Sequence, residues 1–273
     1  MIMGLDSSRG EPITSGDGVM KVWYEGMSWP VFLSHCVNSD QSVEGRVAAD
    51  TFNRVWFSSQ AFSRHLLVHH RSLLADPSTV IIELGAGCGL VSLCAASAGA
   101  KQVIITDLEE ALPLLRQNVA KNVKSGGVEV QKLHWGELAD VLQITEGMCG
   151  NLLVLGSDLI WHEKLFDALL TTMVQLADLP AANPGILSVE IQLASEMRFM
   201  ADLPGDFCAK AKEQGFEVVA TDLDVEGLEP EQPDSQAVHD EYEAEANARW
   251  IVHHRYWRTT ATSPQGGCGA GSA

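Results

Sequence analysis

The sequence VIIELGAGCGL at residues 80–90, followed by VIITD at residues 103–107, decides the fold of this chain. In each segment a short apolar run ends in an acidic residue, and glycines at alternate positions follow the first acid. This pattern is typical of a buried parallel strand that turns sharply into a helix, because glycine adopts the positive φ angles of the turn and lets a ligand approach the backbone. We therefore predict that a nucleotide-like ligand lies across the turn.

Strand-like and helix-like segments alternate along the chain around this turn. Strands are predicted at residues 80–84, 102–106, 128–133, 152–156, 186–189, 216–220 and 249–256. Helices are predicted at residues 61–74, 90–98, 109–122, 163–177 and, with a break at Pro204-Gly205, 197–214. Such alternation indicates an α/β fold, in which a mostly parallel sheet carries helices on both faces. The ligand crevice of this fold lies beyond the carboxyl ends of the strands, at the topological switch point.

The expected organisation is a single domain at residues 19–258, between a flexible leader at 1–18 and a disordered Gly/Ser/Thr-rich tail at 259–273. Within the domain, an N-terminal β extension at residues 19–57 precedes the α/β core at 58–258. The extension is predicted to hold a β-hairpin and then a further strand or extended segment, from the strand-like runs at 19–24, 29–37 and 43–56.

The chain is acidic, with a formal net charge of −18 over 273 residues. The acids concentrate in residues 213–248, which hold twelve Asp or Glu and no Lys or Arg. This argues against nucleic-acid phosphate as the main partner, since phosphate binding needs a basic face. The acidic loop at residues 222–247 has two interpretations that the sequence leaves open. It is either a surface that attracts a basic partner or a solvated, partly disordered loop.

Other features narrow the class of protein. No window approaches the ~18 uncharged apolar residues of a membrane span, and residues 1–18 resemble neither a secretory signal nor a transit peptide. We expect no membrane attachment and a location in the cytoplasm or the nucleus. Six cysteines without a CxxC spacing indicate reduced thiols. His65 and His69 have a spacing that metal sites use, but no third ligand accompanies them, so no metal is predicted.

The residues around the glycine turn differ from the dinucleotide-binding fingerprint. Leu90 stands where that fingerprint has its third glycine, and Glu83 would repel a pyrophosphate but accept a hydrogen bond from an ammonium group. Asp107, at the end of the second strand, is expected to bind both hydroxyls of a ribose. The site therefore suits a nucleoside with a cationic tail that carries no phosphate. S-adenosylmethionine meets both demands, and NAD meets only one.

Four blocks of sequence share one resemblance. They are ELGAGCGLVSLCAASAGAKQVIITD at residues 83–107, NVAKN at 118–122, LHWGE at 133–137 and LGSDLIW at 155–161. Together they resemble the seven-β-strand protein-lysine methyltransferases, and more narrowly methyltransferase-like family 21 and its relatives, over roughly residues 50–220. The resemblance implies a Rossmann-like, seven-stranded class I methyltransferase sheet of order 3-2-1-4-5-7-6, with strand 7 antiparallel.

The resemblance also implies a site for S-adenosylmethionine. The glycine turn would line the methionine part of this cofactor, Asp107 would bind its ribose, and Trp135 would flank its adenine. Trp56 and the backbone of Ser157 would complete the contacts. The predicted cofactor-binding residues are Trp56, Glu83, Gly85, Ala86, Gly87, Asp107, Leu108, Trp135 and Ser157.

Asp158 and Trp161 are the predicted catalytic residues. Asp158 follows the fourth strand and is expected to orient the incoming amine. Methyl transfer from a sulfonium requires alignment, exclusion of water and a neutral amine more than covalent help, so no dedicated general base is predicted. Trp161 stands where the family usually has Tyr, and His134 where it often has Asp. A Trp ring offers a π face to an ammonium group but lacks the Tyr hydroxyl.

The predicted function is S-adenosylmethionine-dependent N-methylation of a lysine side chain in a protein. We expect a monomer whose substrate presents an accessible lysine on a basic surface, with no nucleic-acid partner. Two alternatives stay open: a methyltransferase for a small molecule, and a catalytically silent protein that binds the cofactor and a basic partner. An NAD-dependent oxidoreductase is disfavoured by Leu90 and Glu83.

Overall fold

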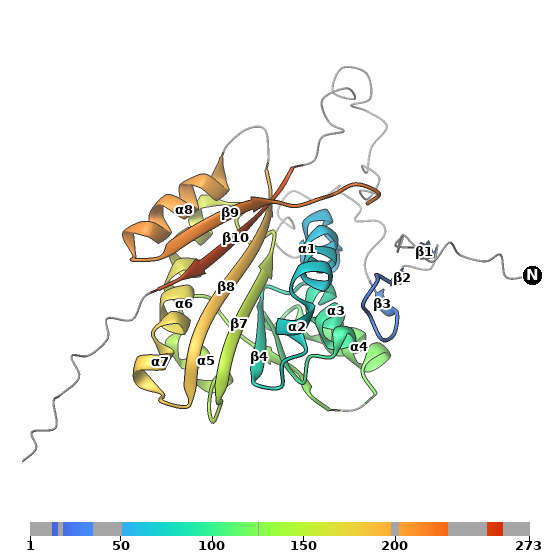
Figure 1. The fold of residues 1–273 in the computed structure, drawn as a ribbon, viewed down its shortest axis with the longest axis horizontal. Coiled ribbons are helices and arrows are strands. Elements are labelled where there is room, and N and C mark those ends of the chain that lie inside the picture. The colour runs from blue at the N-terminus through green and yellow to red at the C-terminus, as the bar shows by residue number, and fades with distance from the viewer. Residues whose placement is uncertain are drawn as a thin grey trace, which may run out of the picture.

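The computed structural model describes residues 13–15, 19–34, 51–124, 126–197, 202–228 and 250–258. These residues form a central seven-stranded sheet covered by helices on both faces, and a small three-stranded sheet lies beside it (Figure 1). No helix within the described ranges combines the length and the apolar character that crossing a membrane requires.

The strand order in the large sheet confirms the predicted order 3-2-1-4-5-7-6, with β10 antiparallel to both of its neighbours. Along the sheet the strands are β6 (Val128–Lys132), β5 (Gln102–Asp107), β4 (Thr79–Leu84), β7 (Gly150–Ser157), β8 (Ile186–Glu196), β10 (Ile251–Trp257) and β9 (Glu217–Asp222). β4 pairs in parallel with β5 on one side and with β7 on the other. The topological switch point therefore lies at β4.

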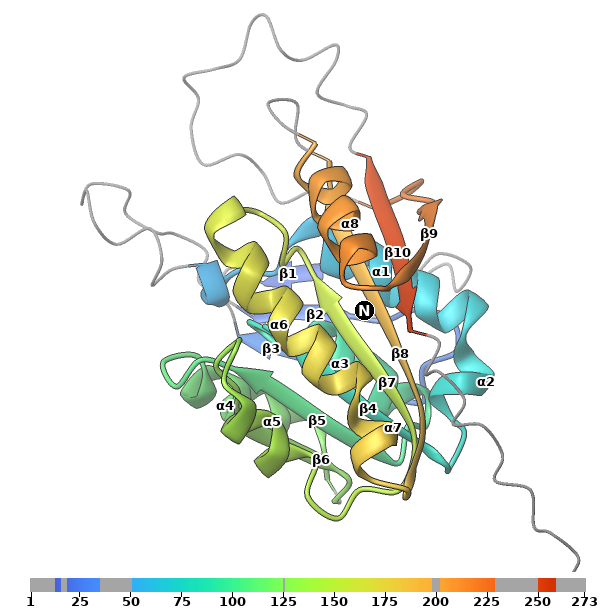
Figure 2. The same ribbon diagram turned by 90° about the vertical axis from the view of Figure 1, so that its left-hand side faces the viewer.

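The two faces of this sheet carry separate hydrophobic cores. The first face is covered by α1 (Phe57–His69), α2 (Arg71–Leu74), α3 (Leu90–Ala98) and α4 (Leu112–Asn122). The second is covered by α5 (Leu138–Ile144), α6 (Phe166–Ala177), α7 (Leu179–Ala182) and α8 (Leu203–Glu213) (Figure 2). Because successive strand residues point to opposite faces, Ile81 packs in the first core, whereas Val80 and Ile82 pack in the second.

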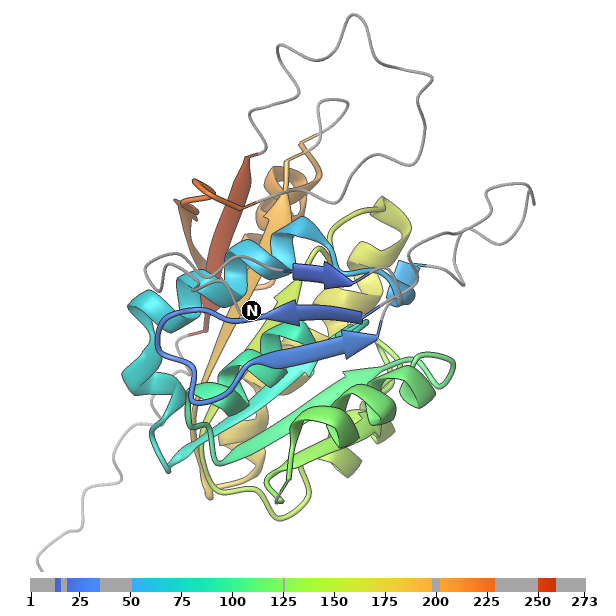
Figure 3. The same ribbon diagram turned by 90° about the vertical axis from the view of Figure 1, so that its right-hand side faces the viewer.

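The N-terminal extension is a three-stranded antiparallel sheet, where the sequence predicts a hairpin. Its strands are β1 (Ile13–Ser15), β2 (Val19–Val22) and β3 (Val31–Ser34), and it lies over α3 and α4 (Figure 3). β1 falls inside the segment predicted to be a flexible leader at residues 1–18, whose residues 16–18 lie outside the described residues. Residues 1–12 and the predicted tail at 259–273 lie outside the described residues.

The segment that leads into α1, predicted to be a further strand or extended segment, contains no strand among its described residues 51–56. Residues 43–50 lie outside the described residues, and the next residues form the short 3-10 helix η1 (Thr51–Asn53). The chain here folds over the glycine turn, where the Phe52 carbonyl accepts a hydrogen bond from Cys88 Sγ at 3.6 Å. This contact joins two residues that are far apart in the sequence.

Two asparagines of α4 hold the outer edge of β3. Asn122 accepts from the Phe32 N–H at 2.7 Å and donates to the Phe32 carbonyl at 2.6 Å. Asn118 forms the same pair with Ser34, at 2.8 Å and 3.2 Å. Asn118 Nδ2 also donates to the Cys88 carbonyl at 2.9 Å. The NVAKN block therefore connects the N-terminal sheet to the glycine turn.

Several element boundaries differ from the prediction. The break predicted at Pro204-Gly205 is wrong, because α8 begins at Leu203 and Pro204 lies in its first turn, where the missing N–H costs nothing. The Asp202 side chain accepts from the Gly205 N–H at 2.9 Å and caps this turn. α4 begins later than predicted and β8 extends further. The predicted helix at 61–74 is two helices, α1 and α2, and α5 and α7 were not predicted.

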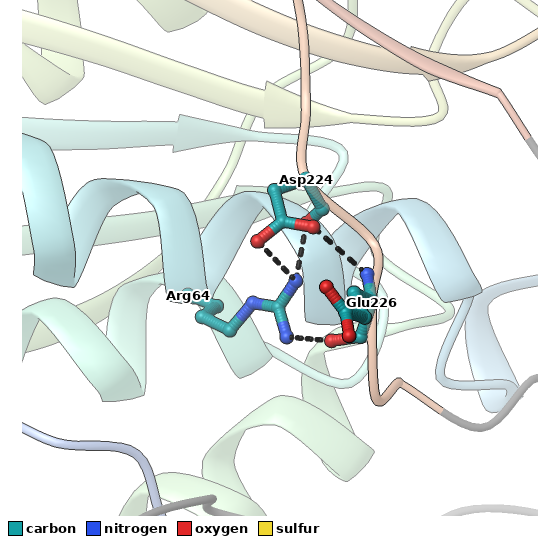
Figure 4. A network of polar contacts seen from close by, with 3 residues as sticks. All are labelled: Arg64, Asp224 and Glu226. Atoms are coloured by element: carbon teal, nitrogen blue, oxygen red, sulfur yellow. Dashed lines mark hydrogen bonds and ion pairs between the residues drawn. The ribbon is translucent and has the colours of Figure 1, made fainter.

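Arg64 on α1 holds the chain that follows β9 (Figure 4). Its guanidinium donates to the Glu226 carbonyl at 2.6 Å and to the Asp224 carbonyl, and it pairs with the Asp224 carboxylate at 3.6 Å. Leu223 and Leu228 on this segment are buried in the first core. The beginning of the predicted acidic loop is thus anchored to α1, while its residues 229–247 lie outside the described residues.

Removing the guanidinium of Arg64 should release this segment without unfolding the domain. In Arg64→Met, the amide of Leu223, which donates to the Ile251 carbonyl at 2.9 Å, should exchange its hydrogen roughly tenfold faster, because its opening no longer breaks two charge-assisted bonds. Hydrogen exchange followed by mass spectrometry is the measurement. Arg116→Met, an exposed change on α4, is the matched control. Equal protection in the two variants would contradict the anchoring role.

Four histidines gather where α1 ends and meets β10. The ring centroid of His65 lies 4.7 Å from that of His69, 5.4 Å from that of His70 and 4.8 Å from that of His253. His253 Nε2 is also hydrogen-bonded to Gln192 Oε1 at 3.0 Å. Burial, reinforced by the neighbouring imidazoles, lowers the pKa of His65 to about 4 and that of His253 to about 3. These rings are therefore neutral at pH 7.

Acid should destabilise the fold through these histidines. In the unfolded chain a His takes up its proton near pH 6.5, whereas folded His65 and His253 remain neutral until about pH 4 and 3. The unfolded state therefore binds more protons below pH 6.5, and the free energy of unfolding falls as the pH decreases from 6.5 toward 4. His65→Phe should make this fall shallower in urea unfolding at pH 7, 6 and 5. The exposed His162→Phe is the control, and an unchanged slope in His65→Phe would disprove the assignment.

Candidate functional site

A pocket of about 390 Å³ opens beyond the carboxyl ends of β4, β5 and β7. Its volume lies within the roughly 300–1,000 Å³ of small-molecule sites. The pocket brings together all of the predicted site residues except Glu83. Those that line it are Trp56, Gly85, Ala86, Gly87, Asp107, Leu108, Trp135, Ser157, Asp158 and Trp161.

The glycine turn approaches the other pocket walls too closely for side chains. Gly85 and Gly87 have φ angles of 54° and 55°, in the left-handed region that favours glycine. A Cβ atom on Gly85 would lie 2.7 Å from Leu159 Cδ2 and 3.0 Å from Trp135 Cζ2. On Gly87 it would lie 3.3 Å from the Phe52 carbonyl oxygen. Because neither residue has a Cβ atom, the backbone of the turn itself lines the pocket.

The carboxylate of Asp107 is held in one orientation by the backbone. Oδ2 accepts from the Gly87 N–H at 2.8 Å, and Oδ1 accepts from the Leu108 N–H at 2.7 Å. Burial raises the pKa of Asp107 above its usual value, although these two hydrogen bonds oppose the shift. Each oxygen keeps a further lone pair. Such a pair of acceptors suits two neighbouring hydroxyl groups of a ligand.

Glu83 lies behind the turn, away from the pocket wall. Its side chain is only 1% exposed, and Oε2 accepts from the Ser92 N–H at 3.0 Å. Ser92 is in the first turn of α3, whose N-cap is Gly89 and has no side chain to satisfy these N–H groups. Burial raises the pKa of Glu83 to about 8. The structure thus gives Glu83 a helix-capping contact, and its predicted contact with a ligand ammonium stays a prediction.

Asp158 is held in a backbone conformation that residues other than glycine adopt only rarely. Its φ is 55°, the only positive φ of a non-glycine residue in the described part of the chain. The residue is 8% exposed, and its N–H donates to the Ala194 carbonyl of β8 at 2.8 Å. Such strain costs on the order of 1–3 kcal/mol and is found mostly at functional sites. The pairing of β7 with β8 therefore forces this carboxylate into the pocket wall.

Trp161 and Trp56 are two aromatic residues of the pocket wall. Trp161 is half-buried, and its ring meets His162 edge-on with centroids 5.8 Å apart. Trp56 is the N-cap of α1, and the guanidinium of Arg54 lies 5.5 Å from the centroid of its ring. Both tryptophans line the pocket, and their predicted roles toward a cofactor and an amine stay predictions. Trp135 completes the aromatic lining from the loop after β6.

Phe52 and Arg54 also line the pocket and were not predicted. They precede Trp56 at alternate positions, in the segment that the sequence predicts to be a further strand or extended segment. That spacing placed them with Trp56 on one side of the chain, but nothing local showed that this side faces the glycine turn. His134, where the resemblance expects Asp, lines the pocket as well.

Most of this domain matches one known protein family. A profile described as lysine methyltransferase matches residues 21–206, which is more than half of the chain. The chain belongs to this lysine methyltransferase family. The match begins within β2 and ends in α8, so it leaves out β1 but includes β3 and all the pocket-lining residues.

Relatives of this lysine methyltransferase family member match it over shorter stretches. METTL21A of Danio rerio, named a protein N-lysine methyltransferase, is 40% identical over 126 residues, which are 45% of this chain and 55% of that protein. EEF1A lysine methyltransferase 3 of Mus musculus is 41% identical over 120 residues, 43% of this chain and 45% of that protein. The histone-arginine methyltransferase METTL23 of Mus musculus is 33% identical over 123 residues, 44% and 45% of the two chains. The chain spans about half the length of these relatives.

A solved structure supports the fold of this family member. It comes from Streptococcus mutans and is described as a candidate S-adenosylmethionine-dependent methyltransferase. It superposes with a TM-score of 0.51 at 12% identity, covering 89% of this chain and 56% of that chain. At this identity the likeness shows the fold alone.

The buried carboxyl of Glu83 should make the fold less stable as the pH rises. Unfolded Glu ionises near pH 4.5, but the folded pKa is about 8, so between these values the folded state binds more protons and the free energy of unfolding falls with increasing pH. Glu83→Gln cannot ionise and should remove up to about 1 kcal/mol of this fall per pH unit. Urea unfolding from pH 5 to 8 tests this against the exposed Glu213→Gln. Parallel curves for the wild type and Glu83→Gln would refute it.

Proposed function

We propose that this chain is an S-adenosylmethionine-dependent N-methyltransferase that modifies a lysine side chain of a protein. The observation that carries the proposal is the placement of Asp107 and Asp158 in one pocket, on either side of the glycine turn. One carboxylate is oriented by backbone N–H groups, and the other is presented by a strained backbone. Membership of the lysine methyltransferase family supports the same chemistry.

The residues of the pocket fit this cofactor. Asp107 offers two oriented acceptors to a ribose diol, and the turn of Gly85 and Gly87 leaves room for a chain to lie against the backbone. Leu108 and Trp135 provide apolar surface for a base. When bound, S-adenosylmethionine supplies a methyl group attached to a positively charged sulfur.

Asp158 would bind and orient the target amine. A carboxylate stabilises the ammonium form of lysine, which has a pKa near 10.4 in water, so Asp158 favours arrival of the charged side chain and does not by itself remove its proton. The proton would leave to solvent before the nitrogen lone pair attacks. The main contribution of the site is thus alignment, which is worth a large share of the barrier when reacting groups are held at contact distance.

The aromatic wall would exclude water around the reacting groups. Trp161 is half-buried and lines the same pocket as Asp158, and its π face suits an ammonium or methylammonium group. Trp56 also lines the pocket. A Trp in place of the family Tyr removes one hydrogen-bond acceptor for the amine and leaves the cation–π contact as the means of holding it.

A protein substrate with basic residues near its lysine is part of the proposal. Two of the relatives described above are named protein-lysine methyltransferases, and the net charge of −18 would steer a basic surface toward this chain. We further propose that the enzyme is a monomer and acts in the cytoplasm or the nucleus.

Two substitutions should separate cofactor binding from methyl transfer. Asp107→Asn cannot accept from both Gly87 and Leu108, and it should weaken S-adenosylhomocysteine binding at least tenfold in calorimetry.

Asp158→Asn tolerates the positive φ of this position. It should keep the affinity for S-adenosylhomocysteine within about threefold of the wild type. It should lower the labelling of lysate proteins by a radioactive methyl donor about a hundredfold.

The same binding and labelling experiments on the wild-type protein test the proposed function as a whole. Folded wild-type protein that gives no heat with S-adenosylhomocysteine would rule out the cofactor. Binding without labelling of any protein in several lysates would instead support the silent binding protein, and equal labelling by Asp158→Asn would remove the role given to Asp158.

A further inference from the structure

Trp135 lies in a short loop whose residues on either side of it are held by two different helices. On one side, the N–H of His134 donates to Oδ2 of Asp140 on α5 at 2.9 Å. On the other side, both backbone polar groups of Gly136 are bonded to side chains of α6. None of these helical side chains is among the residues that line the described pocket. The position of Trp135 in the pocket wall therefore depends on residues behind that wall.

The contacts of Gly136 come from Thr172 and Gln175. Thr172 Oγ1 accepts from the Gly136 N–H at 2.7 Å, and Gln175 Nε2 donates to the Gly136 carbonyl at 3.1 Å. Thr172 is fully buried, and its hydroxyl donates to the Ala168 carbonyl at 3.2 Å. A hydroxyl has one hydrogen and two lone pairs, so Oγ1 can make both contacts at once. The backbone donor and the backbone acceptor are thus both fixed at the residue after Trp135.

The indole of Trp135 meets the glycine turn at close range. A Cβ atom on Gly85 would lie 3.0 Å from Trp135 Cζ2, so the ring lies directly against the backbone of the turn. In the proposed function this ring provides surface for the base of the cofactor. Stacking on an aromatic ring depends on the orientation of that ring. A rotation of Trp135 would therefore remove the stacking and leave the acceptors that Asp107 offers to the ribose unchanged.

We propose that Thr172 and Gln175 are positioning residues that hold the indole of Trp135 in the orientation in which it stacks on the base of the cofactor. This inference rests on the proposed function, and it gives α6 a part in recognition of the base. The two residues contact the backbone of the loop and act on the ligand through the ring. The affinity for the nucleoside end of the ligand is thus set in part by side chains outside the pocket.

The surroundings of Gln175 separate this role from simple stabilisation of the fold. Its Oε1 atom is buried and has no hydrogen-bond partner in the described part of the chain. A buried acceptor without a partner is destabilising, and an apolar side chain of similar size avoids this penalty. The donation from Nε2 to Gly136 therefore fixes the loop at some loss of stability. Gln175→Leu should accordingly release the loop with little change in the urea unfolding midpoint.

Fluorine NMR of the full chain labelled with 5-fluorotryptophan tests the positioning without any ligand. The Trp135 resonance is the one that is lost in Trp135→Leu. Thr172→Val keeps the shape of the side chain and removes the acceptor for Gly136, so this resonance should shift or broaden while those of the other tryptophans stay in place. Thr171→Val is the matched control. Within the described residues the exposed Thr171 hydroxyl bonds only to the Asp167 carbonyl of its own helix, at 2.7 Å.

Binding shows whether the two residues act through Trp135. In calorimetry with S-adenosylhomocysteine, Thr172→Val and Gln175→Leu should each weaken binding about tenfold, within the range covered by loss of one aromatic–base contact. In the Trp135→Leu background the same changes should alter the affinity less than about twofold, because the ring on which they act is absent. Thr172→Ser, which keeps the hydroxyl, and Thr171→Val should bind as the wild type does.

Three outcomes would overturn the inference. A Trp135 resonance that is unchanged in Thr172→Val would show that the loop keeps its place without the hydrogen bond. An equal loss of affinity in the wild-type and Trp135→Leu backgrounds would show that Thr172 and Gln175 only stabilise the fold. A wild type that gives no heat with S-adenosylhomocysteine would overturn the proposed cofactor and the stacking role together. The fluorine signal is read without ligand and so distinguishes that failure from the other two.

Discussion

Parallel pairing of β4 on both of its edges is the constraint from which the site follows. Ile82 lies opposite Ile104 of β5 on one side and opposite Val154 of β7 on the other. Because the three strands are parallel, the segments that follow them all leave the sheet at the same edge. β4 is buried along its whole length, so the turn that follows it lies at that edge. The glycine turn, Asp107 and Asp158 therefore meet although about seventy residues separate the first from the last.

The three acids at the ends of these strands have three different surroundings. Glu83 points to the α3 side of the sheet and is enclosed by it, Asp107 is oriented by its own turn, and Asp158 is exposed to the pocket by a strained φ. The direction that the chain takes after each strand determines the surroundings of the acidic residue at the end of that strand. An acidic residue after a parallel strand thus has no single role, and burial and backbone partners determine its chemistry.

The strands and the glycine turn could be predicted because their signals are local: apolar runs, glycine spacing and the acids that follow. The expectation that Gly85, Asp107 and Asp158 share one site followed from the strand order that the family resemblance implies. The surroundings of Glu83 were also available from the sequence, because it shares the strand parity of Ile81 and must face α3. Arg54 could not be found in this way, since its place depends on a fold-back contact between residues far apart in the chain.

The asparagines of α4 have a consequence for self-association. An outer strand with unpaired N–H and C=O groups can template the addition of another chain. On β3 those groups, at Phe32 and Ser34, are already bonded to Asn122 and Asn118. The helix thus takes the place of a fourth strand, and this edge of the small sheet is closed to intermolecular β-pairing for as long as the two amides remain in position.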